Sequence, residues 1–435
     1  MNSLVERSDG IPGCEVSATC NTKINIPNSQ IPYDPNNPTA AQKASAARDN
    51  CGAINSCSVF NAKEQLVSVT GAHAYQSPAT NQLRGPCPGL NAAANHGYLP
   101  RSGAPTILQT INGLGAAYGM SLDLAGILAA YAVAIDGDPV TGTWSIGGPQ
   151  AGLPIIENGQ GISWSHNKYE GDTSIGRCDA YINNGDAHSL STTRYAYAYE
   201  VGMADDSYTF DKFAQAFTAN TFRSIQQNPY YFAPLFSTTL VAPAAYNFVI
   251  AFMSNHTAQQ PGGYLNGAIF KEFFAITGDY PNFSWQPGQE RIPNNWYRRP
   301  SSQQYQAVGG VFGDLIPNFL AYPNSFRFGG NTGKVNTYTG IDLANYTNGV
   351  YNADNLFQGN NFACFVYQNI QQGQPDSVNA NPLASTVAGI FTPYLNKVFG
   401  GITCPQLQSL NDNNLGVYPG HKYSPNPPAN APENC

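Results

Sequence analysis

A cysteine held between two prolines is the most chemically suggestive feature of this sequence. Cys87 lies in the stretch RGPCPGLNAAANHGYLPRSG, between Pro86 and Pro88. Such a cysteine cannot lie inside a helix or a central strand, because proline lacks an N–H and fixes its own backbone. After Pro88 the residues GLNAAANHG can begin a helix whose free N–H groups point back at the sulfur. Such donors lower a thiol's pKa and tune a bound metal, although a disulfide partner or a buried thiol remains an alternative for Cys87.

A second stretch, YEGDTSIGRCDA, gathers oxygen-bearing side chains. It places Glu170, Asp172, Ser174 and Arg177 within eight residues. A hard cation prefers oxygen ligands, and a carboxylate, a carbonyl and a hydroxyl on one turn can supply them. On spacing alone, however, most such clusters are solvated or cap a helix.

The cysteine stretch resembles the proximal-ligand motif of the haem-thiolate peroxidase family, which contains fungal chloroperoxidases and unspecific peroxygenases. The similarity continues through PCPGLN, ANHGYLPR and the following glycine, and is closest to the long peroxygenases. It implies that Cys87 is the axial thiolate ligand of haem b, donating electron density that favours O–O cleavage. His96 falls within the motif and is expected to be structural.

The same resemblance assigns roles to two further stretches. It implies that Glu170, the carbonyl of Gly171 and Ser174 bind Mg²⁺ near a haem propionate. Near the C-terminus, GKVNTYTG and NFACFVYQNI resemble the last third of long peroxygenases, which implies a disulfide between Cys364 and Cys404. The resemblance covers about residues 80–418.

The sequence departs from this family at the distal acid–base group. Long peroxygenases use a Glu for this role, positioned by an Arg seven residues before it, after a helix that here ends in RSIQQNP. Alignment places Ser237 at the Arg and Ala244 at the Glu, and no Asp, Glu, Lys or Arg lies between Arg223 and Lys271. Loss of a general acid–base costs about 10² to 10⁴ in rate. The remaining candidates for the proton relay, each of which can equally be an ordinary polar residue, are His166, Glu200 and His256.

The resemblance implies a peroxidase or peroxygenase that uses hydrogen peroxide on small hydrophobic organic substrates. We expect residues 210–250 to line an apolar distal channel, with Phe217, Phe236 and Tyr246 as candidates. One alternative is a haem-binding protein of the same fold without turnover, because the distal Glu is missing. Another is a secreted structural protein without haem, which would require Cys87 to be oxidised.

The elements that must position these residues are predicted to be mainly helical, with long loops. Ser121 is placed to cap a helix, and Phe210, Phe213 and Phe217 recur at helical spacing in the next long segment. Alternation typical of strands is scarce and best at 335–340. The predicted helices cover 105–117, 121–135, 209–227, 264–276 and 381–399.

Three parts of the chain differ in composition. Residues 1–75 hold four cysteines without a sustained apolar period and are predicted to be a disulfide-bearing extension, with Cys14–Cys20 and Cys51–Cys57 as the favoured pairs. Residues 76–418 are predicted to form a single haem domain, and residues 419–435 a Pro-rich tail.

Composition limits the partners and the cellular location that we expect for the protein. The net charge is −7 and no basic cluster occurs, which argues against nucleic acid or an anionic membrane as partner. The longest apolar run, 124–135, reads as a buried helix. Residues 1–10 do not resemble a signal peptide, yet nine cysteines favour a secreted protein whose signal has been removed. Sequons that secretion would expose to glycosylation lie at Asn255, Asn282 and Asn345.

Overall fold

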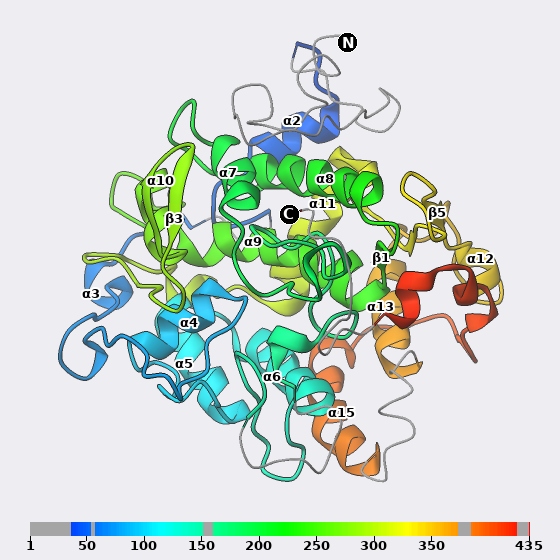
Figure 1. Ribbon diagram of the computed structural model, residues 1–435, viewed down its shortest axis with the longest axis horizontal. Coiled ribbons are helices and arrows are strands. Elements are labelled where there is room, and N and C mark those ends of the chain that lie inside the picture. Colours follow the sequence, from blue (N-terminus) through cyan, green and yellow to red (C-terminus); the bar gives the residue numbers. More distant parts are fainter. Residues whose placement is uncertain (1–35, 54–56, 151–159, 373–383, 424–434) are drawn as a thin grey trace.

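The computed structural model describes residues 36–53, 57–150, 160–372, 384–423 and 435, and it is mainly helical (Figure 1). This confirms the predicted fold class. Its α-helices are α2 (Ala40–Ala46), α3 (Ala62–Gln65), α4 (Pro88–Asn95), α5 (Ile107–Tyr118), α6 (Leu122–Asp136), α7 (Thr192–Glu200), α8 (Phe210–Gln227), α9 (Ala242–Met253), α10 (Gly267–Phe273), α11 (Gly313–Ala321), α12 (Leu343–Tyr346), α13 (Asn361–Gln372) and α15 (Ala384–Phe399).

The strands are few and short. A three-stranded antiparallel sheet pairs β4 (Gly329–Gly330) with both β1 (Phe232–Ala233) and β5 (Thr339–Gly340). A separate hairpin joins β2 (Ile276–Asp279) to β3 (Asn282–Trp285), with Ile276 opposite Trp285. The strand predicted at 335–340 is therefore confirmed over its last two residues, in β5.

Three predicted helices form close to their predicted bounds because their caps and apolar spacing agree. The Ser121 side chain accepts a hydrogen bond from the Leu124 N–H and so caps α6. Thr209 caps α8 in the same way, and α8 ends at Asn228, just before Pro229. The prediction 264–276 was too long, because it contains the shorter α10 and reaches into β2. The prediction 381–399 is confirmed over α15, and its first three residues, 381–383, lie outside the described residues.

The helices enclose two large apolar clusters. α8 and α9 pack against each other, and so do α5 and α6. The first cluster lies around Leu114, Phe213 and Phe252, and the second around Tyr131, Leu315 and Phe365. α9 runs through the middle of the molecule, with α8 on one side and the blue and cyan helices α4 and α5 on the other (Figure 1).

The sequence analysis missed α9 and the turn that leads into it. Residues Leu235–Val241 form a π-helix that continues directly into α9. This whole segment, Leu235–Met253, is long and apolar enough to cross a membrane, but 78 % of its most apolar stretch is buried inside the protein. A helix that is apolar all round is typical of a protein core as well as of a membrane span.

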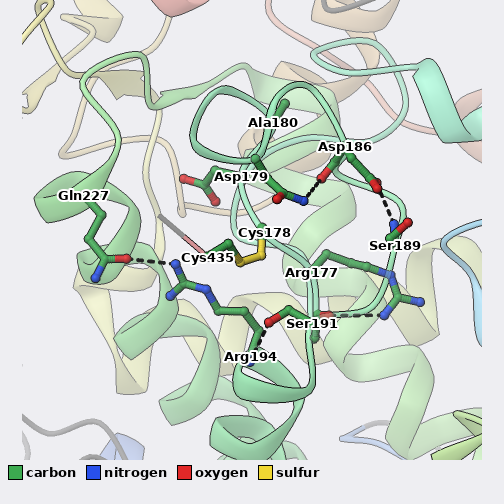
Figure 2. Close-up of a disulfide and its surroundings, with 12 residues drawn as sticks. Arg177, Cys178, Asp179, Ala180, Asp186, Ser189, Ser191, Arg194, Gln227 and Cys435 are labelled. Atoms are coloured by element: carbon green, nitrogen blue, oxygen red, sulfur yellow. Dashed lines mark hydrogen bonds between the residues drawn. A yellow bond between two sulfur atoms is a disulfide. The ribbon is translucent and has the colours of Figure 1, made fainter. Parts of the chain in front are cut away.

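Disulfides connect distant parts of the chain. The predicted pairs Cys51–Cys57 and Cys364–Cys404 are confirmed, whereas Cys14 and Cys20 lie outside the described residues. A third disulfide, Cys178–Cys435, joins the last residue to a loop near the centre of the molecule (Figure 2). Among the described cysteines, Cys87 alone is unpaired.

The described part of the N-terminal segment packs against the rest of the protein. α2 contacts α8 and α11, and Arg48 forms an ion pair with Asp314 at 3.1 Å. The Asn50 amide donates to the Tyr208 carbonyl at 3.0 Å. The division of the chain at residues 75 and 418 stays a prediction.

Candidate active site

A cavity opens at Cys87, with about 740 Å³ of space between its walls and at its mouth. The Cys87 turn forms one wall and α9 another. Most of the lining is apolar, and besides the thiol of Cys87 its ionisable acid and base are Glu170 and Arg177. The lining residues are Pro86, Cys87, Pro88, Gly89, Leu90, Leu114, Tyr118, Met120, Glu170, Ser174, Ile175, Arg177, Ala245, Phe248, Val249, Phe252 and Met253.

Cys87 is the residue that precedes the first turn of α4. It has extended backbone angles (φ −91°, ψ 109°), and Pro88 occupies the first helical position, as predicted from the Pro-Cys-Pro sequence. The free N–H groups of Gly89 and Leu90 are directed at the sulfur and favour its thiolate form. The turn therefore presents a single sulfur to the cavity, on a backbone fixed by two prolines.

Opposing effects act on the pKa of the Cys87 thiol. Burial raises the pKa from 9.0 to about 11, and this effect outweighs the N–H groups of Leu90 and Gly89, which lower it. The Glu170 carboxylate raises the pKa further, and Arg177 lowers it. The expected effect of the N–H donors on the thiol pKa is therefore confirmed, but the desolvation that outweighs it was not visible in the sequence.

Buried polar contacts hold the Cys87 turn from behind. Arg177 donates from Nη2 to the Pro86 carbonyl at 2.8 Å. Asn91 clamps Gly85, accepting from its N–H at 3.0 Å and donating to its carbonyl at 2.8 Å. The Glu290 carboxyl lies nearby, and burial raises its pKa from 4.5 to about 7, while Asn91, Arg177 and Arg84 lower it less. Sequence reasoning missed Glu290, since 203 residues separate it from Cys87.

The oxygen atoms predicted to bind Mg²⁺ lie together at the cavity. Ser174 Oγ is 2.8 Å from Glu170 Oε2 and 3.4 Å from the Gly171 carbonyl oxygen. Burial raises the pKa of Glu170 to about 7, opposed by the Ser174 hydrogen bond and the Arg177 charge. A carboxylate, a carbonyl and a hydroxyl this close together match the donors that a hard cation takes. The donor set therefore fits the predicted ion.

The close approach of Thr238 leaves no room for a side chain at position 171. A Cβ atom at this position would lie 2.0 Å from Thr238 Oγ1 and 3.0 Å from Ser237 Oγ. Ser237, which aligns with the positioning Arg of long peroxygenases, is thus next to the Glu170 loop. Its hydroxyl and that of Thr238 are buried without a hydrogen-bond partner in the described protein.

The wall formed by α9 carries no acid. Ala245, Phe248 and Phe252 line the cavity, one helical turn apart. Ala244, which aligns with the missing Glu, instead packs in the second apolar cluster and is 4 % exposed. Position 245 rather than position 244 therefore faces the sulfur side of the cavity.

The structure places the three candidates for a proton relay outside the cavity lining. His166 is buried, with Nε2 3.9 Å from an Asp172 oxygen, and burial lowers its pKa to about 4. Glu200 lies at the end of α7 and accepts from the Tyr280 hydroxyl at 2.9 Å. His256 lies beside the Cys51–Cys57 disulfide, and its Nδ1 is 2.8 Å from the Pro261 carbonyl oxygen.

The aromatic residues suggested for the channel also pack elsewhere. Phe217 and Tyr246 contact each other in the first apolar cluster, with ring centroids 5.3 Å apart. Phe236 packs against Tyr131 in the second apolar cluster, with ring centroids 3.9 Å apart. The cavity is lined instead by Phe248 and Phe252 of α9 and by Tyr118 of α5.

Comparison with known proteins places the chain in a family. Residues 73–301 match the family described as "Peroxidase, family 2". The chain belongs to this peroxidase family. The resemblance seen in the sequence is thereby confirmed, and the family is one of oxidoreductases.

Relatives of this family 2 peroxidase extend over most of its length. The dothistromin biosynthesis peroxidase of Dothistroma septosporum is 36 % identical over 369 residues, covering 83 % of this chain and 87 % of that protein. An aromatic peroxidase of Fusarium equiseti is 34 % identical over 81 % of this chain and 83 % of its own. An aromatic peroxygenase of Cyclocybe aegerita is 28 % identical over 64 % of this chain and 69 % of its own.

Proposed function

We propose that this family 2 peroxidase binds haem b through the Cys87 thiolate and uses hydrogen peroxide to oxidise or oxygenate small hydrophobic organic molecules. The observation that carries the proposal is the position of Cys87. It is the unpaired member of the described cysteines, and its sulfur lies at the wall of the apolar cavity. When bound there, thiolate-ligated haem supplies cleavage of the peroxide O–O bond.

The residues of the chain contribute binding and exclusion of water. Cys87 provides the sulfur, and the Gly89 and Leu90 N–H groups stabilise its negative charge. Phe248, Phe252 and Leu114 give the cavity an apolar lining that favours an apolar substrate. Arg177 holds the Pro86 carbonyl, so that the turn keeps its shape when the sulfur is charged.

We also propose Mg²⁺ at Glu170, the Gly171 carbonyl and Ser174. The three oxygen donors support this, as does a buried carboxylate whose pKa burial raises to about 7 and which a cation would stabilise as the anion. Metal analysis of purified Glu170→Gln protein should show loss of Mg²⁺ relative to the wild type. Full metal occupancy in this variant would contradict the assignment.

A haem-binding protein without turnover is the second candidate. It is favoured by the alanines at 244 and 245 and by the placement of His166, Glu200 and His256 outside the cavity lining. Glu170 is the acid that does line the cavity, and the first proposal uses it as a metal ligand. The two candidates differ in whether peroxide reacts productively.

Stopped-flow absorbance with hydrogen peroxide separates these two functions. The resting spectrum before mixing reports whether haem is bound. For the proposed peroxidase we expect a rapid, saturable change in the Soret band that a hydrophobic substrate reverses. A haem spectrum that does not respond, or that only bleaches, would overturn this proposal and favour the second candidate.

We further propose that the protein is secreted. Two of the sequon residues, Asn282 and Asn345, are exposed, and three disulfides join described cysteines. Asn255 is a poorer acceptor for glycan because its side chain is engaged with Tyr264 and with the Tyr297 N–H. Protein secreted from a eukaryotic host should lose mass on enzymatic removal of N-glycans, and no change in mass would contradict modification at these sites.

A further inference from the structure

A second, smaller pocket lies between α7 and α8, apart from the Cys87 cavity. It has about 280 Å³ of space, including its open mouth, and is lined by two arginines, Arg194 of α7 and Arg223 of α8, together with small and aromatic side chains. Arg194 is 9 % and Arg223 3 % exposed, so both guanidinium groups are inside the protein. Figure 2 shows Arg194 directed at Gln227, beside the Cys178–Cys435 disulfide. Nothing in the proposed reaction uses these arginines.

The contacts of the two guanidinium groups are incomplete. Arg223 donates from Nη1 to Asn220 Oδ1 at 2.7 Å and stacks on the Tyr197 ring at 3.8 Å. Its Nη2 is buried and has no hydrogen-bond partner in the described protein. Arg194 donates from Nη2 to Gln227 Oε1 at 2.8 Å. All of these partners are neutral.

Neither arginine forms an ion pair with a described carboxylate. The nearby acid is Asp179, and its oxygens already accept from the Thr173 N–H, Ser224 Oγ and Asn228 Nδ2. Among the described side chains, two like charges therefore share one buried pocket, and the nearby Asp179 lies outside ion-pair distance. Burial, together with the Arg194 charge, lowers the pKa of Arg223 to about 9. Charges in such a position are normally paired.

We propose that this pocket binds a small inorganic anion of halide size between Arg194 and Arg223. A buried anion would accept from the free Nη2 of Arg223 and offset the repulsion between the two guanidinium groups. The pocket is smaller than the Cys87 cavity, and the rings of Tyr197 and Tyr246 narrow it, which favours a monatomic anion over an organic acid. An anion with one negative charge is enough to balance the two guanidinium groups, because the nearby Asp179 offsets part of their positive charge.

Binding of an anion in this pocket would stabilise the Glu170 loop through Asn220. Asn220, which accepts from Arg223, also donates to the Thr173 carbonyl at 2.9 Å, three residues beyond Glu170. The last turn of α8 leads to Asn228, which donates to both Asp172 and Asp179. An anion that holds α7 and α8 together would therefore raise the thermal stability of the whole protein.

Thermal unfolding of the purified holoprotein in sodium bromide or chloride tests the proposal, with sodium gluconate keeping the ionic strength constant. We expect a saturable rise in Tm of about 2 °C or more with either halide. Arg223→Gln and Arg194→Gln should each abolish that rise. Arg48→Gln is the matched control, because it removes a buried arginine that has its own partner, Asp314. It should lower Tm but keep the halide-dependent rise.

Crystals of the wild-type protein grown with bromide give a readout that does not depend on whether the variants fold. We expect an anomalous-scattering peak in contact with Arg223 Nη2 and the Arg194 guanidinium. Absence of a peak there, or an equal halide-dependent rise in the wild type and both variants, would overturn the proposal. The result is independent of any peroxide chemistry at Cys87.

Discussion

The sulfur of Cys87 is subject to two opposing influences of its surroundings. Burial in an apolar wall raises the pKa of the thiol to about 11, while the Gly89 and Leu90 N–H groups favour the thiolate. A metal cation reverses the balance, because a coordinating thiol is deprotonated outright. The same turn is therefore a poor nucleophile by itself and a suitable ligand for iron.

Glu290 provides a prediction at the residue scale. Its pKa is raised in the folded protein, from 4.5 to about 7, so between these values the folded state binds more protons than the unfolded state. Stability should therefore fall as pH rises through this window, by at most about 3 kcal/mol from this group. Glu290→Gln should unfold with a flatter dependence of Tm on pH between 5 and 8.

The matched control for this substitution is Glu64→Gln, at a carboxylate that is 36 % exposed. This control should keep the pH dependence of the wild type, because solvent screens an exposed charge. An unchanged slope in Glu290→Gln would show that the Glu290 carboxyl does not titrate in this window.

At the scale of elements, the π-helical turn Leu235–Val241 sets the rotation of α9. A π turn uses i→i+5 bonds, so it shifts every later side chain relative to an uninterrupted α-helix. As a result Ala245 lines the cavity, while Ala244 packs among Leu235, Leu240 and their neighbours. The element therefore decides which position could carry an acid–base group.

A matched pair of substitutions tests this rotation. Ala245→Glu should place a carboxylate in the cavity and speed the peroxide-driven Soret change by about 10²-fold, within the range for general acid–base catalysis. Ala244→Glu should bury an unpaired carboxylate in apolar surroundings, lower Tm and leave the rate near that of the wild type. Faster reaction in Ala244→Glu than in Ala245→Glu would contradict the structure of this segment.

Local signals predicted those elements in which the sequence carries both a cap and an amphipathic pattern. Ser121 and Thr209 with the apolar spacing behind them give α6 and α8, and Pro88 gives the start of α4. α9 was not predicted, because Leu235–Met253 is apolar on all sides and has no apolar stripe that helical periodicity would reveal.

The candidate site was predictable where its residues are close in sequence. Cys87 and the Glu170–Ser174 group were found in this way, and both lie at one cavity. The position of Glu290 behind the Cys87 turn was not predicted, nor was the shared pocket of Arg194 and Arg223. Tertiary packing alone brings these residues together.

For the whole molecule, the disulfides differ in the length of chain that they constrain. Cys178–Cys435 spans 257 residues, whereas Cys51–Cys57 spans six. The first connects Cys435 to the loop that follows Arg177 (Figure 2). Arg177 in turn donates to the Pro86 carbonyl of the Cys87 turn. The end of the chain is thus joined to the support of the proposed ligand.

The chain-entropy relation predicts unequal effects of removing these two disulfides. Replacing Cys178 and Cys435 by Ser should cost about 5 kcal/mol, against about 2 kcal/mol for Cys51 and Cys57. Comparison of denaturant midpoints of the two double variants, under non-reducing conditions, checks this. An equal or larger loss from the short loop would mean that strain or denatured-state structure, rather than loop length, sets the effect.

The measurement that tests the account most directly is the absorption spectrum of the ferrous–CO complex. Wild-type protein should show the red-shifted Soret band of a thiolate ligand. Cys87→Ala should lose that band, while the Cys51→Ser, Cys57→Ser double variant, which leaves the cavity intact, should retain it. A Cys87→Ala protein that keeps the same red-shifted band would show that the iron is held by another residue and would contradict the site proposed here.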